Sequence, residues 1–218
     1  MTERRKVAAL ISGRGSNMAS LISASMDPAY PAEIALVISN RPGAAGLERA
    51  AEFGIETATI DHKDFQNDRE AFERALDEKL KAHGIEFVAL AGFMRLLSPW
   101  FVTQWRDRMI NIHPALLPSF KGLHTHERAL EEGVKLHGAT VHYVSAEMDD
   151  GPIIIQGAVP VLDGDTPDTL AERVLAVEHR IYPKALELVA SGRARVKDQR
   201  VAVAGEDADQ ANAVLIWP

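Results

Sequence analysis

Short, uninterrupted apolar runs alternate with amphipathic stretches through the first half of this 218-residue chain. The runs lie within residues 7–11, 33–39 and 87–91, and residues 56–60 form a third, weaker strand of the same series. Strands that are apolar on both faces, with a helical pattern after each, are typical of a parallel sheet covered by helices on both sides. We therefore predict an α/β fold with a Rossmann-like open sheet that is parallel in its N-terminal half.

The helices of this half are predicted from apolar periodicity and from the glycines that follow two of them. One helix should end at Ser25, and the next two should span 44–53 and 68–83. Gly54 and Gly84 stand directly after the last two, where glycine commonly ends a helix.

The second half of the chain has a different pattern. We predict strands at 109–112, 139–144 and 153–161, a short helix at 125–132 and a long helix at 167–191. Only eight residues separate the last two strands, which favours antiparallel pairing over a crossover. The C-terminal half of the sheet should therefore be mixed.

The end of the chain carries weaker signals. Asp165 or Thr166 can cap the long helix, with Pro167 in its first turn. Beyond that helix, 194–203 and 213–217 are expected to form short edge strands or a loosely held end. No repeat or linker divides the sequence, so we expect one domain over residues 1–218.

Composition limits the possible functions. The chain has no cysteine, which excludes disulfides, thiolate catalysis and cysteine-based zinc sites. No apolar run approaches the roughly 18 residues of a membrane-spanning helix. With 24 basic and 31 acidic residues, the net charge is −7. This balance favours a small-molecule substrate over a nucleic acid. The lack of cysteines and of a membrane-spanning run predicts a cytoplasmic protein without a membrane partner.

A glycine-containing loop, Ser-Gly-Arg-Gly-Ser-Asn at 12–17, lies between the first strand and the first helix. Glycines let a backbone approach a ligand closely, and the N–H groups of a helix N-terminus attract anions. The dinucleotide fingerprint is incomplete, because Met18 replaces its third glycine and no acidic residue follows the second strand at 39–41. Two interpretations stay open: a site for a phosphate monoester, which fits best, and a tight turn capped by Ser16.

Three complementary side chains are expected at the carboxyl edge of the sheet, where ligands bind in open α/β sheets. Asn111 and His113 are two residues apart on a strand and can share a face, and Asp149 comes from another strand end. An amide can donate to an oxyanion, an imidazole can stabilise it or carry a proton, and a carboxylate can orient the imidazole. No serine or cysteine lies beside them, so we predict direct transfer without a covalent intermediate.

Other interpretations of these histidines stay open. His113 could be a structural residue before the proline turn, or a metal ligand, because five of the eight histidines lie between 113 and 142. No cysteine or evident carboxylate completes a ligand set, so we predict no metal. The other histidines of this segment are expected to fix the loop around the site through hydrogen bonds: His124, His126, His137 and His142.

The remaining candidates have weaker signals. Residues 93–97 follow a strand end and form either core or the wall of a pocket for a flat aromatic ligand. Glu178 lies on the long helix and is by default a solvated charge, and Arg69 and Lys121 are by default surface residues.

Four motifs together resemble the glycinamide ribonucleotide formyltransferase family of purine biosynthesis, and the resemblance runs from about residue 6 to about residue 190. They are SGRGSN at 12–17, AGFMRLLSP at 91–99, NIHPALLPSFKG at 111–122 and DDGPII at 149–154. The combination is specific, whereas each motif alone is shared with relatives. The resemblance implies transfer of a formyl group from 10-formyltetrahydrofolate, as co-substrate, to the glycyl amine of glycinamide ribonucleotide.

The resemblance also implies roles for individual residues, in a phosphate-binding lobe of about 1–100 and a catalytic and folate-binding lobe of about 101–218. The catalytic residues would be Asn111, His113 and Asp149. The ribonucleotide would contact Gly15, Ser16, Asn17, Pro114 and Glu178. The folate would contact Arg69, Met94, Arg95, Leu96, Leu97, Ser145, Ala146, Glu147 and Met148.

The chain departs from the family pattern at two positions. Ala146 replaces an acidic residue that some members carry in the folate loop, and Asp150 stands where many have glycine. The position relative to Gly151-Pro152 selects Asp149 as the catalytic aspartate.

Three rival functions remain. Formyltetrahydrofolate deformylase shares the three catalytic residues but typically carries an extra regulatory domain before the first strand. Methionyl-tRNA formyltransferase usually has a further C-terminal domain and a different first loop. A non-catalytic nucleotide sensor would not need the intact Asn, His and Asp. A homodimer is left open by the sequence.

Overall fold

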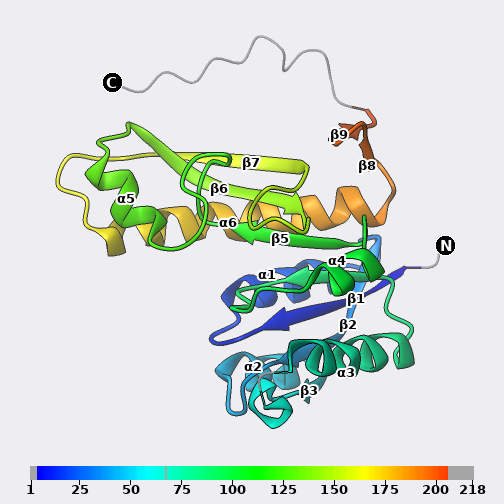
Figure 1. Ribbon diagram of the computed structural model, residues 1–218. Coiled ribbons are helices and arrows are strands. Elements are labelled where there is room, and N and C mark those ends of the chain that lie inside the picture. The colour runs from blue at the N-terminus through cyan, green and yellow to red at the C-terminus, as the bar shows by residue number, and fades with distance from the viewer. Residues whose placement is uncertain (1–3, 67, 206–218) are drawn as a thin grey trace.

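The computed structural model describes residues 4–66 and 68–205, and its centre is a seven-stranded sheet. The strands are β1 (Arg5–Ile11), β2 (Ala32–Ser39), β3 (Glu56–Thr59), β4 (Phe87–Leu90), β5 (Met109–His113), β6 (Leu136–Tyr143) and β7 (Ile153–Pro160). Their order is β3-β2-β1-β4-β5-β6-β7 (Figure 1). Strands β1 to β5 are parallel, whereas β6 is antiparallel to both β5 and β7. The predicted open sheet, parallel and then mixed, is confirmed.

Helices cover both faces of this sheet, as the continuous apolar strands predicted. They are α1 (Ser16–Ser25), α2 (Ala45–Glu52), α3 (Arg69–Ala82), α4 (Pro99–Gln104), α5 (Thr125–Glu131) and α6 (Pro167–Ala190). Buried residues of α1, α2, α5 and α6 belong to one core, and those of α3 and α4 belong to the other.

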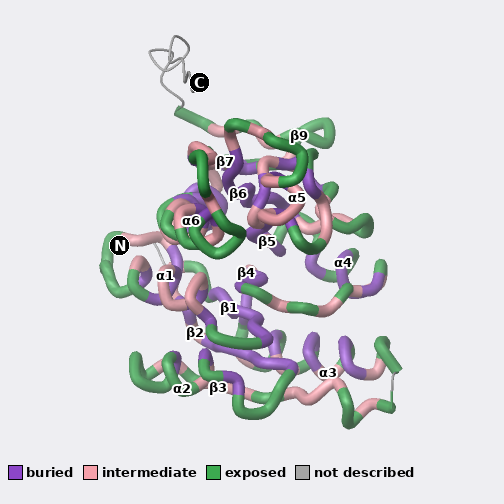
Figure 2. Tube along the Cα trace, turned by 90° about the vertical axis from the view of Figure 1, so that its left-hand side faces the viewer, coloured by how far each residue is buried: buried purple, intermediate pink, exposed green. Residues whose placement is uncertain are grey.

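Strand β1 shows why its apolar run is unbroken. Val7, Ala9 and Ile11 face the first core, while Ala8 and Leu10 face the second. Successive side chains of a strand point to opposite faces, so a strand between two helical layers must be apolar at every position. Figure 2 shows β1 as buried over most of its length, from Val7 to Ile11.

Two short helices were not predicted. The 3₁₀ helix η1 (His62–Phe65) follows β3, and α4 follows the segment after β4. The start of α4 did have a signal, because Ser98 accepts a hydrogen bond from the N–H of Phe101 and Pro99 stands at the first helical position.

The C-terminal prediction needs correction. Strands β8 (Ala194–Lys197) and β9 (Arg200–Val203) pair with each other in a separate two-stranded sheet, and not with the edge of the large one. The strand expected at 213–217 lies outside the described residues. At the start of α6, Thr166 is the cap, while Asp165 instead binds Arg173.

None of the helices in the described part of the chain is long and apolar enough to cross a membrane.

The strand order reverses between β1 and β4, and this is where a ligand crevice is expected in an open α/β sheet. The segments that leave these two strands are bonded to each other. The N–H of Ser12 donates to the Gly92 carbonyl at 3.1 Å, and the Ser12 hydroxyl accepts from the N–H of Met94 at 2.8 Å. The glycine loop and the segment after β4 are therefore held together at the carboxyl edge.

We predict that Gly138→Ala weakens the fold. A methyl group on Gly138 would lie 2.0 Å from the carbonyl oxygen of Gly157, so β6 and β7 would have to separate. The free energy of unfolding in urea should fall by about 1–3 kcal/mol. Gly13→Ala is the control, because its added methyl meets nothing within 4 Å. Equal stability of the two variants would contradict this packing.

Candidate active site

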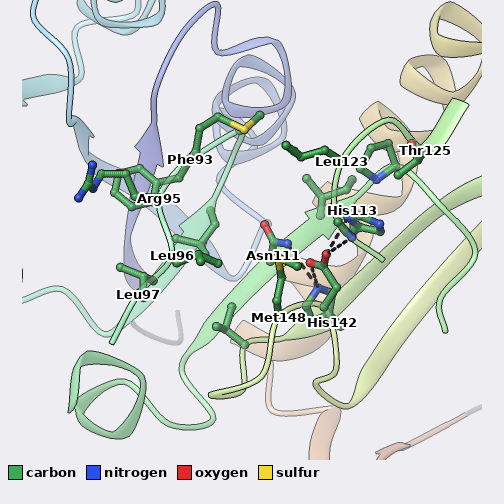
Figure 3. A pocket seen from close by; sticks show the side chains of 18 of the residues that line it. Phe93, Arg95, Leu96, Leu97, Asn111, His113, Leu123, Thr125, His142 and Met148 are labelled. Carbon is green, nitrogen blue, oxygen red and sulfur yellow. Dashed lines mark hydrogen bonds and ion pairs between the residues drawn. The ribbon is translucent and has the colours of Figure 1, made fainter. Parts of the chain in front are cut away.

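The end of β5 positions the first two predicted residues. Asn111 and His113 share a face of the sheet, and the antiparallel register places Asn111 opposite His142 and His113 opposite Thr140. His113 is buried, and Asn111 is partly exposed at the floor of a cavity (Figure 3). The spacing of two therefore brings the amide and the imidazole together as predicted.

Both ring nitrogens of His113 face oxygen atoms. Nε2 lies 2.9 Å from the carbonyl oxygen of Phe120, and Nδ1 lies 3.5 Å from Oδ2 of Asp149. A carbonyl oxygen only accepts, so Nε2 must carry a proton. The Nδ1 side, which faces the carboxylate across a longer gap, is the side available to a substrate atom.

The two neighbouring aspartates point to different partners. Asp149 has a positive φ of 53°, and its Oδ2 accepts the N–H of Gly122 at 2.9 Å while facing His113. Asp150 instead forms an ion pair with Lys121, and this hydrogen bond lowers the pKa of the Asp150 carboxyl. Of the two, the structure places Asp149 beside His113.

His142 holds the amide of Asn111. Its Nδ1 donates to the carbonyl oxygen of Tyr143 at 2.8 Å, so Nε2 is free to accept from Nδ2 of Asn111 at 3.3 Å. Burial lowers the pKa of His142, which keeps the ring neutral and Nε2 an acceptor. The sequence predicted a hydrogen-bonding role for His142, but in the loop and not on Asn111.

His126 and His137 do not make the predicted hydrogen bonds. Nδ1 of His126 and both ring nitrogens of His137 are buried without a hydrogen-bond partner. The two rings pack edge to face at 5.3 Å, and His137 packs in the same way on Phe120 at 5.7 Å. Burial lowers the pKa of His137 to about 4, so near neutral pH its imidazole is uncharged and packs as an aromatic ring.

His124, the remaining histidine of the segment 113–142, is exposed, and its Nδ1 lies 3.4 Å from a carboxylate oxygen of Glu127. Within residues 4–66 and 68–205, no three His, Asp or Glu side chains converge as they would around a metal ion.

A cavity of about 750 Å³ opens beside these residues. Figure 3 shows Phe93, Leu96 and Leu97 on one side of it, Leu123 and Met148 on the other, and Asn111 between them. All eight residues of the two segments predicted for folate line this cavity, together with the three catalytic candidates and Pro114, which was predicted to contact the ribonucleotide: Met94, Arg95, Leu96, Leu97, Asn111, His113, Pro114, Ser145, Ala146, Glu147, Met148 and Asp149.

Some lining residues were missed, and one predicted residue lies elsewhere. Leu90, Val102 and Leu123 also form the apolar wall, next to Phe93 of the predicted segment 93–97. Leu90 is the last residue of β4, Val102 lies in the unpredicted helix α4, and Leu123 lies in a loop. Arg69 is exposed at the first position of α3 and is not part of the cavity wall.

The glycine loop has a second, separate arrangement of polar groups. Gly15 adopts a left-handed φ of 68°, and a methyl there would meet Gly46 of α2 at 3.0 Å. The loop is thus packed tightly against the start of α2, and Ser16 and Asn17 begin α1. Nδ2 of Asn17 donates to Glu178 at 2.8 Å, while its Oδ1 is buried without a hydrogen-bond partner.

Glu178 is not the solvated charge expected by default. It is 6% exposed, and burial raises the pKa of its carboxyl, an effect that the hydrogen bond from Asn17 partly offsets. Periodicity could have found it, because Val174 and Tyr182, four residues to either side, are both buried on α6. Glu178 therefore lies on the buried face of the helix, pointing at the glycine loop.

Comparisons with known proteins agree with this fold and site. The sequence profile of the formyl transferase family matches residues 5–186. The phosphoribosylglycinamide formyltransferase of Escherichia coli (strain K12) is 42% identical over 92% of this chain and 94% of that protein. The crystal structure of glycinamide ribonucleotide transformylase 1 from Symbiobacterium toebii has a TM-score of 0.90 at 45% identity, covering 93% and 95% of the two chains.

The chain therefore belongs to the formyl transferase family. The chain covers 94% of the first of these two relatives and 95% of the second, so each is similar to it over almost its whole length. A longer relative, the trifunctional purine biosynthetic protein adenosine-3 of Bos taurus, is 51% identical over 89% of this chain, but the chain spans only 19% of that protein.

We predict that Glu178→Gln stabilises the fold at neutral pH. The folded-state pKa is raised, so the charged carboxylate is destabilising above the unfolded pKa, and glutamine removes this charge while keeping an acceptor for Asn17. Urea unfolding near pH 7 should show the variant to be more stable than the parent protein. The difference should vanish below about pH 4, where the carboxyl is protonated in both states.

The exposed Glu172 on the same helix provides the control, since Glu172→Gln should shift stability little at either pH. A less stable Glu178→Gln protein near pH 7 would show that the charged carboxylate is favoured at this position.

Proposed function

We propose that this chain transfers the formyl group of 10-formyltetrahydrofolate to the glycyl amine of glycinamide ribonucleotide, in the de novo purine pathway. The observation that carries the proposal is the opening of the Asn111, His113 and Asp149 group into one apolar cavity. Its volume of about 750 Å³ lies within the usual range for small-molecule sites.

The donor would place its flat pterin between the two apolar walls of the cavity. Residues 94–97 form one wall, and residues 145–148 belong to the other. Arg69 lies outside this cavity, so it could contact only a part of the donor that extends beyond it.

The acceptor would bind its phosphate at Gly15, Ser16 and Asn17. One feature supports this: the N-terminus of α1 supplies N–H groups that can donate to an anion. Glu178 would hold the ribonucleotide through the carboxylate that it presents to Asn17, and Pro114 would contact it from the cavity side.

The chemistry follows from the hydrogen bonds. The glycyl amine attacks the formyl carbon, a C–N bond forms, and the carbonyl oxygen becomes an oxyanion. Asn111 would donate to this oxyanion, and so would Nδ1 of His113 with the ring in its imidazolium form, in which Nε2 still donates to the Phe120 carbonyl. Asp149 would accept the proton of the amine, directly or through water. When the tetrahedral intermediate collapses, the bond to the folate nitrogen breaks, and that nitrogen takes up the proton that Asp149 received from the amine.

The other parts of the proposal concern conditions and partners. The partners would be the two small-molecule substrates and not a nucleic acid, and the protein would act in the cytoplasm. No metal would be required, because the site offers no converging set of ligands among the described residues. Full loss of activity on chelation, restored by one equivalent of a divalent ion, would contradict this.

A turnover assay with 10-formyltetrahydrofolate tests the function. Release of tetrahydrofolate should depend on glycinamide ribonucleotide, and the riboside without phosphate should be a poor acceptor. His113→Ala and Asn111→Ala should each lower kcat about a hundredfold or more, because each removes an oxyanion donor. Turnover without any acceptor would indicate a deformylase, and binding without turnover would indicate a sensor.

The two aspartates provide a separate prediction. Asp149→Asn should lower kcat about a hundredfold, because Asp149 is the carboxylate that faces His113. Asp150→Asn should have little effect, since it removes only an exposed ion pair with Lys121. Steady-state kinetics of both variants would decide, and the reverse ranking would show that Asp150 is the catalytic residue.

A further inference from the structure

The loop at 120–124 supplies one backbone group to His113 and one to Asp149. The carbonyl of Phe120 accepts from Nε2 of His113, and the N–H of Gly122 donates to Asp149, both at 2.9 Å. A shift of this loop would therefore change the orientation of the imidazole and of the carboxylate together.

This loop has an unusual backbone and no strand or helix of its own. Phe120 and His124 have left-handed φ values of 55° and 56°, which residues other than glycine rarely adopt. Such conformations persist only where surrounding contacts enforce them. The contacts that hold the loop in this shape are therefore part of the catalytic geometry.

One side chain of α5 makes three contacts with the loop. Nη1 of Arg128 donates to the carbonyl of Lys121 at 2.7 Å and approaches that of Leu123 at 3.5 Å. Its guanidinium also lies over the ring of Phe120, 5.5 Å from the centroid. A planar guanidinium can make several directed contacts at once, which an ammonium cannot.

We propose that Arg128 is a positioning residue for the formyl transfer, and the inference rests on the function proposed above. Arg128 is not part of the cavity wall, whereas Thr125, His126 and Glu127 of the same helix are. It therefore acts through the loop, by holding the Phe120 carbonyl against His113 and the Gly122 N–H against Asp149.

The test compares Arg128→Met with Arg108→Met. Arg108 is a matched control, because it too donates to a backbone carbonyl, that of Gln104 at 2.7 Å, and lies over an aromatic ring, that of Trp105. It does not line the cavity. Arg128→Met should lower kcat about tenfold or more with little change in KM for the ribonucleotide, because small misplacements of catalytic groups reduce rate strongly. Arg108→Met should retain kcat.

Two further measurements separate positioning from loss of fold. Arg128→Lys, which keeps the charge and one donor, should recover part of the kcat lost in Arg128→Met. Circular dichroism should show both variants folded at the assay temperature. Arg128→Met with kcat within about twofold of the parent, or an equal loss in Arg108→Met, would overturn the proposal.

A readout without substrate keeps this inference distinct from the proposed function. The ¹⁵N resonances of the His113 ring report whether Nε2 is protonated and bonded, and Arg128→Met should change them while Arg108→Met should not. Unchanged His113 resonances would overturn the positioning role. Changed resonances in a protein that turns over neither substrate would instead support the positioning role and reject the transferase function.

Discussion

The antiparallel pairing of β5 with β6 is the constraint on which the site depends. All strands up to β5 run in parallel, so their carboxyl ends meet at one edge, and β6 begins its return at that edge. The register sets Asn111 beside His142, and a neutral His142 ring then fixes the amide of Asn111. A slip of one residue would turn His142 to the opposite face of the sheet.

Much of this arrangement was predictable, because it depends on local spacing. Unbroken apolar runs predicted the parallel strands, and the separation of two residues placed Asn111 and His113 on one face. The contact between Asn111 and His142 was not predictable, because it depends on the register of β5 and β6. These strands are separated by 22 residues of sequence, from the end of β5 at His113 to the start of β6 at Leu136. The partner of His113 Nε2 was equally hidden, because a backbone carbonyl in a loop leaves no mark in the sequence.

Buried polar residues were the other source of error. Sequence alone treats Glu178 and the histidines as groups that seek water or hydrogen bonds, as most of their kind do. In the folded chain, His126 and His137 instead pack as neutral rings under the loop, and Glu178 is taken from solvent to face the glycine loop. Each placement depends on which elements meet in three dimensions. Burial lowers the pKa of the two histidines and raises that of the Glu178 carboxyl, so in each case it favours the neutral form.

The positive φ of Asp149 explains how adjacent aspartates can have different roles. Aspartate adopts the left-handed backbone conformation more readily than most residues. This conformation reverses the chain locally and directs consecutive side chains to different sides. Asp149 therefore reaches His113 and Gly122, while Asp150 reaches Lys121. Because Lys121 and Gly122 are themselves neighbours, the two loops are joined twice. The catalytic end of the cavity is thus held by one loop against the other, on a sheet that supplies Asn111 and His113.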